Sequence, residues 1–141
     1  MNVKVVKVVS EGSNMVLIYH LAEAELWDSS CKSNTPYFPP TYEMDGFIHA
    51  TKELKTLNGI ANHFYKDSLK DYILLEIDTD KLEVEVKFEA PADVGHKSSD
   101  GVDTTELFPH IFGPLHNGPA IARVLPVIRE EDGSFANFEE S

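Results

Sequence analysis

Residues 71–78 read DYILLEID, an apolar stretch of the length of one β-strand. Apolar side chains occupy both sets of alternating positions, which is typical of a strand that is covered on both faces. Residues 15–20, MVLIYH, have the same character. Residues 83–89, EVEVKFE, alternate instead, with an apolar side chain at every second position, and this alternation predicts a strand with one face in water. These three strands are the centre of the expected fold.

Two helices and several further strands are expected around them. Residues 22–32 place apolar side chains four positions apart, and residues 52–66 carry one apolar stripe, so both segments predict helices. Thr51 is well placed to cap the second helix at its N-terminus. Further strands are expected at 3–9, 46–50 and 120–128, and loops at 34–42 and 90–105. Because the last strand contains Pro126, it should lie along a sheet edge. Many strands with only two clear helices predict the α+β class.

The length of 141 residues fits one domain, spanning residues 1–141, with a core over about 15–128 and a loose acidic tail after residue 130. A hydrophobic content of 42% is that of a globular protein. No apolar run approaches the roughly 20 residues that a membrane helix needs, and the N-terminus lacks the pattern of a secretory signal. The single cysteine, Cys31, cannot form an internal disulfide, which suits a reducing compartment. We therefore expect a cytoplasmic protein with no membrane partner.

The charge balance argues against nucleic-acid binding. The chain has 24 acidic and 12 basic residues, a formal net charge of −12, and its only arginines are Arg123 and Arg129. Proteins that bind nucleic acids usually present a basic patch to the phosphate backbone, and no cluster of lysine and arginine is present in the sequence. A small anionic ligand could still be held by main-chain amides. The expected partner is therefore a small molecule.

Three histidines stand in apolar or turn-rich motifs, where histidine is uncommon. They are His20 after Tyr19, His49 in the segment GFIHAT, and His110 in the segment ELFPHIFGPL. Imidazole donates and accepts hydrogen bonds near neutral pH, and its surroundings easily shift its pKa. These three side chains are therefore candidates for a common site. The other histidines, in a predicted helix or in loops, are expected to be structural or solvated.

Competing interpretations remain at this point. Each histidine could instead be a core group that is bonded to a main-chain carbonyl. Three histidines with Glu106 or Asp45 could bind zinc, but the sequence has no HExxH segment and no cysteine pair, and no metal site is predicted. Cysteine and serine nucleophiles are not supported, because Cys31 has no histidine nearby in sequence and the chain has no GxSxG segment.

The same motifs resemble a known family. The order IYH, a tryptophan seven residues later, DGFIHAT, YILLEID, a strand that closes in Glu89, and ELFPHIFGPL resembles the family known as domain of unknown function 952, over residues 15–128. The family usually carries Ser where Thr51 stands and often Tyr where Phe112 stands. The resemblance implies a fold similar to that of the ADP-ribosyltransferases and RNA 2′-phosphotransferases: a split, mostly antiparallel sheet with two or three helices around a cleft.

The resemblance also implies roles for particular residues. In the wider group a histidine that ends an early strand holds the ribose beside nicotinamide, which corresponds to His20. A second motif supports the ring, which corresponds to His49 with Thr51. Glu106 is the candidate for a third, acidic position, with His110 as a rival. Tyr19 and Phe112 are expected to contact substrate.

The resulting expectation is a small-ligand pocket protein, a transferase or hydrolase that acts on a nucleotide or NAD-like substrate. Its predicted catalytic residues are His20, His49, Glu106 and His110. NAD is expected as a substrate, and no bound cofactor is assigned. The alternatives are a non-enzymatic metabolite-binding or sensor module and a metal-binding protein.

Overall fold

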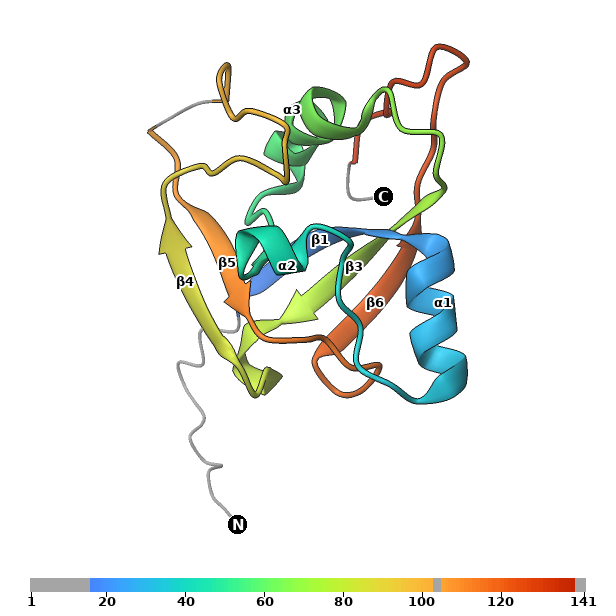
Figure 1. Cartoon of the computed structure of the whole chain (residues 1–141), viewed down its shortest axis with the longest axis vertical. Coiled ribbons are helices and arrows are strands. Elements are labelled where there is room, and N and C mark those ends of the chain that lie inside the picture. The colour runs from blue at the N-terminus through green and yellow to red at the C-terminus, as the bar shows by residue number, and fades with distance from the viewer. Residues whose placement is uncertain (1–15, 103–104, 139–141) are drawn as a thin grey trace.

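The computed structural model describes residues 16–102 and 105–138, and its strands form two antiparallel sheets (Figure 1). In the first sheet β3 (Tyr72–Asp78) lies between β1 (Leu17–Glu23) and β6 (Ile121–Pro126). β1 and β3 pair over the whole length of both strands. The central place of β3 explains its apolar composition, because it has a neighbour on each side and packed elements on each face.

The second sheet has β5 (Phe108–Phe112) in the middle, between β2 (Ile48–His49) and β4 (Glu85–Glu89). The two sheets meet where the main chains of Tyr19 and Thr51 exchange a pair of 2.8 Å hydrogen bonds. This contact fixes the residues that follow β2 against the middle of β1.

Three α-helices and a short 3-10 turn accompany the sheets. They are α1 (Ala24–Ser33), α2 (Tyr42–Asp45), α3 (Leu54–Tyr65) and the turn Thr79–Lys81. Figure 1 shows α1 beside the first sheet and α3 at the opposite end of the view from the turn between β3 and β4. No helix in the described ranges is long and apolar enough to cross a membrane.

Two apolar cores lie on opposite faces of β1 and β3. The first core joins the two sheets to α1, and its members include Ile18, Trp27, Ile48, Leu75 and Ile111. The second core joins the first sheet to α3 and to the C-terminal segment, and its members include Tyr19, Leu21, Leu57, Leu74 and Phe135. Because β1 alternates between the two cores, His20 faces the first core while Tyr19 and Leu21 belong to the second.

The α+β class expected from the sequence is confirmed, with antiparallel pairing in both sheets. The strands expected at 71–78, 83–89 and 120–128 are present as β3, β4 and β6, and β6 lies at a sheet edge and ends at Pro126. The strand expected at 3–9 lies outside the described residues. Helix α2 was not expected; it ends at Asp45, and the φ of 83° at the following Gly46 lets the chain turn into β2.

The expected cap at Thr51 is wrong. Helix α3 begins at Leu54, and the residue at its N-cap position is Glu53, which makes no side-chain capping bond. Thr51 is buried and uses its main-chain groups to pair with Tyr19. Pairing between the sheets therefore takes precedence over local capping at this residue.

Two expectations about exposure also differ from the structure. Phe88 was expected on the buried face of its strand, but β4 is an edge strand and Phe88 is 41% exposed there. The tail after residue 130 was expected to be loose, but Phe135 and Phe138 are buried in the second core. The acidic residues at 130–132 are exposed while Phe135 and Phe138 pack in the second core, so the net charge of the tail does not reveal its packing.

Candidate functional site

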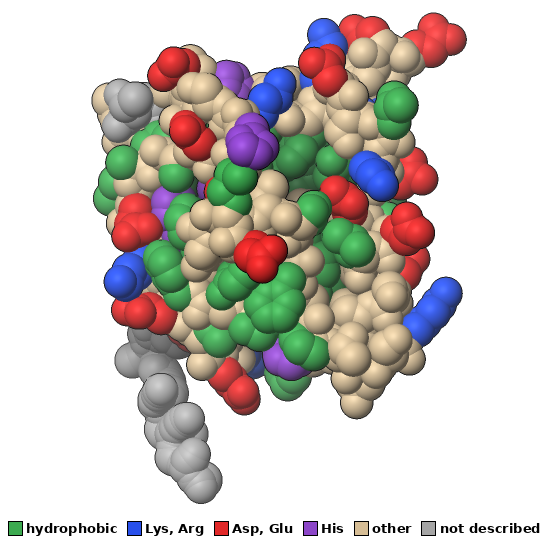
Figure 2. All heavy atoms as spheres, viewed as in Figure 1, with side chains coloured by type: hydrophobic (Ala, Val, Ile, Leu, Met, Phe, Trp, Pro, Cys, Tyr) green, Lys and Arg blue, Asp and Glu red, His purple; other side chains and the backbone are tan. Residues whose placement is uncertain are grey.

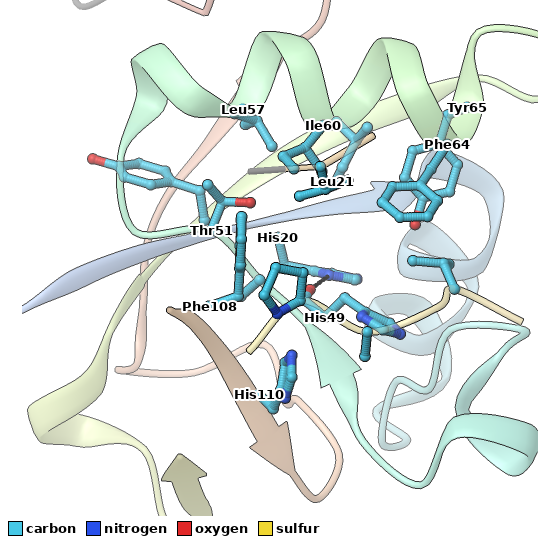
Figure 3. Close-up of a pocket in the computed structure, with 16 residues that line it drawn as sticks. His20, Leu21, His49, Thr51, Leu57, Ile60, Phe64, Tyr65, Phe108 and His110 are labelled. Carbon is cyan, nitrogen blue, oxygen red and sulfur yellow. Dashed lines mark hydrogen bonds between the residues drawn. The ribbon is translucent and has the colours of Figure 1, made fainter. Parts of the chain in front are cut away.

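A pocket opens between α3, β1 and the neighbouring strands β2 and β5 (Figure 3). It encloses about 520 Å3 of empty space, which includes the part that opens to solvent. The centre of a water molecule can move through only about 40 Å3 of this space, so the hollow is narrow. Its dimensions suit a flat ring or a small polar group rather than a whole dinucleotide in this conformation.

The three motif histidines line this pocket together. His20 comes from β1, His49 from β2 and His110 from β5, and the folding of the split sheets brings these strands side by side. Tyr19 and Thr51, which were expected to contact substrate, also line it. The predicted site residues thus converge from segments that are far apart in sequence.

His20 is locked by two hydrogen bonds. Its Nδ1–H donates to the main-chain oxygen of His49 over 2.7 Å, so its Nε2 carries the lone pair and accepts from the Tyr37 hydroxyl over 2.8 Å. The residue is only 4% exposed, and burial lowers the pKa of His20 to about 4. His20 is therefore neutral near pH 7, and both of its nitrogens are engaged within the protein.

His49 has one engaged nitrogen. Its Nε2–H donates to Oδ2 of Asp45 over 2.7 Å, and Nδ1 makes no hydrogen bond to the part of the chain that the structure describes. Burial lowers the pKa of His49, while its hydrogen bond to the Asp45 carboxylate opposes the shift. A neutral imidazole held in this way carries a proton-accepting lone pair on Nδ1.

His110 has the same arrangement with a different carboxylate. Its Nδ1–H donates to Oε1 of Glu89 over 2.7 Å, and Nε2 has no hydrogen-bond partner within residues 16–102 and 105–138. Phe47 stacks on the ring at a centroid distance of 4.1 Å and an interplanar angle of 22°. The ring is thereby fixed on one face by an aromatic neighbour and on one edge by a carboxylate.

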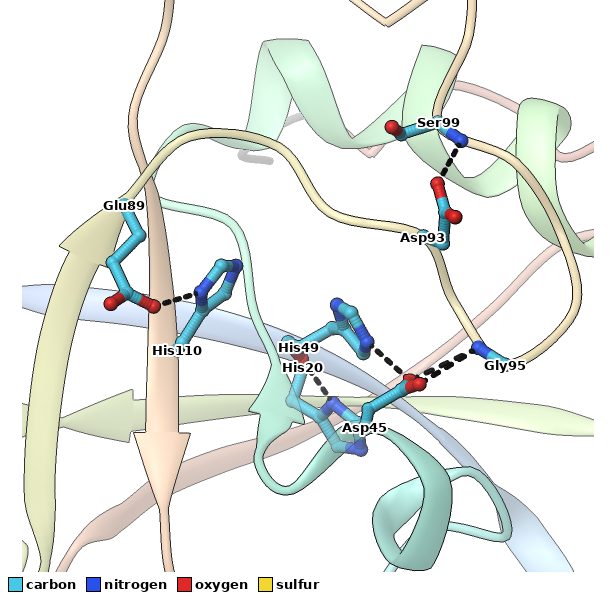
Figure 4. A network of polar contacts seen from close by, with 8 residues as sticks. All are labelled: His20, Asp45, His49, Glu89, Asp93, Gly95, Ser99 and His110. Atoms are coloured by element: carbon cyan, nitrogen blue, oxygen red, sulfur yellow. Dashed lines mark hydrogen bonds and ion pairs between the residues drawn. The ribbon is translucent and has the colours of Figure 1, made fainter.

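The rings of His49 and His110 lie edge to face, with centroids 5.7 Å apart (Figure 4). Each is oriented by its own carboxylate, Asp45 or Glu89, and each has one nitrogen left for other partners. Two such imidazoles can accept a proton at one point and donate a proton at another, which is the requirement for general acid–base chemistry.

The remaining walls of the pocket are mainly apolar. Leu57, Ile60 and Phe64 of α3 face Phe108 of β5, and none of the described lining residues is lysine, arginine, aspartate or glutamate. The side-chain hydroxyls of Thr51 and Tyr65 are neutral polar groups among them that make no hydrogen bond to described residues. The pocket therefore favours an uncharged, planar group.

A loop over residues 90–102 supplies another wall, with Pro91, Ala92, Val94 and Val102 as lining residues. Asp45 ties this loop to the site, because the Gly95 N–H donates to both carboxylate oxygens, at 3.0 and 3.2 Å. Figure 4 shows Asp45 between His49 and Gly95.

Two of the predicted site residues lie outside the pocket. Glu106 lines a separate surface groove with Lys52 and Lys55. Phe112 packs beside Phe47 at a centroid distance of 5.4 Å, and the ammonium group of Lys87 lies 5.1 Å from its ring. Neither side chain is placed to touch a ligand in this pocket.

Sequence reasoning did not assign the carboxylates that orient the histidines. Asp45 was considered only as a possible zinc ligand and Glu89 only as the end of a strand. The spacing of four residues between Asp45 and His49 was a signal for the first pair, but the second pair depends on the register of β4 and β5. No group of three or more histidine, cysteine, aspartate or glutamate side chains within the described ranges could hold a metal ion.

The fold and the site define an α+β pocket protein, in which two antiparallel sheets and a helix enclose a histidine-lined hollow. The family model described as "Protein of unknown function (DUF952)" matches residues 21–123, and the chain belongs to this family.

Two solved structures of protein CC0527 from Caulobacter crescentus resemble the chain. One has 23% sequence identity and the other, a double mutant, has 22%. Each has a TM-score of 0.64 and covers 85% of this chain and 93% of its own. At this identity the likeness shows the fold alone. Among curated proteins, none matches the sequence.

Proposed function

We propose that this chain is a small-ligand pocket enzyme, a transferase or hydrolase that acts on a nucleotide or NAD-like substrate. The observation that carries the proposal is the pairing of two opposed imidazoles, His49 and His110, each with one nitrogen held by a carboxylate and one nitrogen without a partner in the described chain. An imidazole that a carboxylate holds by one nitrogen can transfer a proton at the other nitrogen, which is the arrangement that general acid–base catalysis uses.

The proposal assigns one role to each imidazole, as base or as acid. A neutral His49 takes a proton at Nδ1 from an attacking hydroxyl group or water molecule. A protonated His110 gives its Nε2 proton to the leaving group. After the reaction the two imidazoles have exchanged protonation states, and solvent restores the original states. In this proposal His20 is a positioning residue, because both of its nitrogens are engaged.

The substrate class comes from the family resemblance, and the shape of the pocket is compatible with it. The narrow apolar walls of the pocket suit the flat ring of a nucleotide-type molecule, and its lining has no lysine or arginine to pair with phosphates. The phosphates of such a substrate would therefore lie outside the pocket. Split sheets around a cleft agree with the ADP-ribosyltransferase-like fold that the sequence suggested, and this finer assignment is part of the proposal.

The partner is a small molecule rather than a nucleic acid in this proposal. The net charge of −12 disfavours long polyanions. Figure 2 shows carboxylates spread over one face of the molecule, with lysine and arginine side chains placed singly among them.

The test is calorimetric titration of the purified protein with NAD and with ADP-ribose, followed by product analysis. His49→Gln and His110→Gln should each abolish turnover, while His116→Gln, at an exposed position, should leave it unchanged. If neither NAD nor ADP-ribose binds at millimolar concentration, this substrate class is excluded.

A second candidate is a metabolite-binding module without turnover. The narrowness of the hollow favours it, because a substrate and an attacking group must both fit beside the two imidazoles. This alternative would be supported by a ligand that binds the native chain, binds His49→Gln more weakly, and is recovered unchanged after prolonged incubation.

A further inference from the structure

We propose that Asp45 is a positioning residue which sets the tautomer of His49 and at the same time holds the loop over residues 90–102 against the pocket. This inference rests on the proposed function of the pocket, and it concerns the control of that same site.

The first half of the inference comes from the bond to His49. Asp45 is the last residue of α2, and Gly46 turns the chain so that the Asp45 carboxylate meets the imidazole four residues later. Oδ2 lies 2.7 Å from Nε2. An ionised carboxylate only accepts hydrogen bonds, so the proton of a neutral His49 must reside on Nε2. The lone pair is then forced onto Nδ1, the nitrogen without a partner in the described chain.

The second half comes from the bond to the loop. Both oxygens of Asp45 accept the Gly95 N–H. Gly95 has a φ of 57°, and a Cβ at this position would lie 3.0 Å from Cγ2 of Thr41, so the approach of the loop to Asp45 requires glycine. Two residues that line the pocket, Ala92 and Val94, lie within three positions of this bond.

The other polar contacts of the loop lie farther from His49. Nε2 of His63 donates to the Ser98 carbonyl over 2.8 Å, and the Ser99 N–H donates to Asp93 within the loop over 2.9 Å. The first of these fastens the loop to α3, and the second only shapes the loop. Asp45 is therefore the side chain that joins the loop to an imidazole of the pocket.

The second carboxylate of the site provides an internal comparison. Glu89 orients His110 as Asp45 orients His49, but the Glu89 side chain is 44% exposed and that of Asp45 is 8% exposed. The structure gives Glu89 no bond to the loop, whereas Asp45 has one. Glu89→Gln is consequently a matched control that perturbs one carboxylate–imidazole pair and leaves the loop contact intact.

The consequence is that the loop and the base share one carboxylate. When Asp45 is held by the Gly95 amide, its oxygens are fixed in the geometry that orients His49. If the loop leaves Asp45, the His49 imidazole becomes less firmly oriented. If the imidazole moves, the hydrogen bond that holds the loop changes as well. The position of the loop over residues 90–102 and the orientation of His49 as a base are thereby coupled.

The experiment compares Asp45→Asn, Asp45→Ala and Glu89→Gln in the full chain without ligand. In Asp45→Asn an amide oxygen in the place of Oδ2 can still accept from both His49 and Gly95, but it carries no charge, so both hydrogen bonds weaken. Nitrogen-15 spectra of the labelled imidazoles should show a weaker Nε2–H hydrogen bond for His49 in Asp45→Asn, and a mixture of the two tautomers in Asp45→Ala, where the acceptor is absent. In Asp45→Ala, hydrogen exchange of the Gly95 amide should become faster by about tenfold or more, since its charged acceptor is lost. Glu89→Gln should leave both signals as they are in the native chain.

Three outcomes would overturn the inference. These are unchanged His49 nitrogen signals in both Asp45 variants, unchanged Gly95 exchange in Asp45→Ala, and loss of folding in both variants, which would make Asp45 a determinant of the fold. Because these measurements use no ligand, they are independent of the proposed function. If NAD and ADP-ribose fail to bind while the tautomer and exchange change as expected, the proposed substrate class fails and the role of Asp45 stands. If the native chain has measurable activity, Asp45→Asn should lower kcat by about tenfold or more with a smaller effect on KM.

Discussion

His20 donates its Nδ1–H to the main-chain oxygen of His49 over 2.7 Å, so a histidine of the first sheet fixes the strand that carries a histidine of the second. The other nitrogen of His20 accepts from Tyr37, whose side chain is almost completely buried. The three residues form a buried polar chain across the gap between the sheets. Buried polar groups of this kind stabilise a structure only while every member has its partner.

The first prediction is that Tyr37→Phe destabilises the protein by about 1–3 kcal/mol, because Nε2 of the buried His20 loses its donor while the aromatic ring stays in place. Urea denaturation followed by circular dichroism measures the loss. Tyr42→Phe, at a partly buried tyrosine with no described hydroxyl bond, should change the free energy of unfolding by less than about 0.5 kcal/mol. Equal effects of the two substitutions would argue against the proposed chain of bonds.

The second prediction concerns acid. Burial lowers the pKa of His20 to about 4 from a value of 6.5 in the unfolded chain, so the unfolded state binds the proton more readily. The contribution of His20 to stability is therefore complete above pH 6.5 and declines as the pH falls from 6.5 toward 4, by roughly 3 kcal/mol in total. Denaturation between pH 7 and pH 4 should show this slope, and His20→Gln should show a shallower one. A native chain whose stability does not change over this range would contradict the assignment.

The sequence predicted best what depends on local pattern. The apolar run at 71–78 could be assigned as a central strand because its composition requires cover on both faces. Their motifs predicted that His20, His49 and His110 would lie close together. The motifs did not predict which of the three would have a nitrogen without a partner in the described chain. Whether both nitrogens of an imidazole are engaged depends on residues such as Tyr37, which nothing in the sequence connects to His20.

Other features depend on tertiary contacts and were missed for that reason. The pairing of Glu89 with His110 requires the register of β4 and β5, and a shift of one residue would put Glu89 on the other face. Glu106 was assigned to the third, acidic position on the resemblance to the family, yet the chain directs it to a surface groove. The Asp45–Gly95 contact joins residues that are 50 positions apart and leaves no periodic signal.

The third prediction concerns the ion pair across β3 and β6. Arg123 donates two hydrogen bonds of 2.8 Å to the buried carboxylate of Glu76, and these bonds hold the pKa of Glu76 below its usual value. Arg123→Met should lower the free energy of unfolding by about 1–3 kcal/mol at pH 7, because the buried carboxylate loses its cation. The loss stays in this range because Arg123 is half-exposed in the native protein, where water already screens the pair. The cost should shrink as the pH falls through the native pKa of Glu76. The double variant Glu76→Gln with Arg123→Met should be more stable than Arg123→Met alone, and a less stable double variant would contradict this account.

The fourth prediction separates binding from folding at Thr51. Its hydroxyl lines the pocket and makes no hydrogen bond within the described residues, so Thr51→Val keeps the shape and removes one polar group that a ligand could use. We expect a melting temperature within a few degrees of the native value and an affinity for a bound ligand lower by about five- to tenfold. Differential scanning fluorimetry and calorimetric titration measure the two effects. Unchanged affinity would show that the hydroxyl does not contact the ligand.

The last prediction concerns the C-terminal segment, which supports α3 and through it the wall of the pocket. Phe135 is 3% exposed, Arg129 lies 4.3 Å from the centre of its ring, and the side-chain amide of Asn58 in α3 donates to its carbonyl over 2.7 Å. Phe135→Ala should therefore destabilise the protein by about 3–5 kcal/mol through the cavity that it leaves. Ile128→Ala is the control, because Ile128 is 68% exposed and its truncation should cost less than about 0.5 kcal/mol. Amide exchange in α3 should become faster in Phe135→Ala and stay unchanged in Ile128→Ala, since this aromatic ring fastens the helix to the end of the chain. If Phe135→Ala leaves both the free energy of unfolding and the exchange of α3 as they were, the C-terminal segment does not support the helix that forms the wall of the pocket.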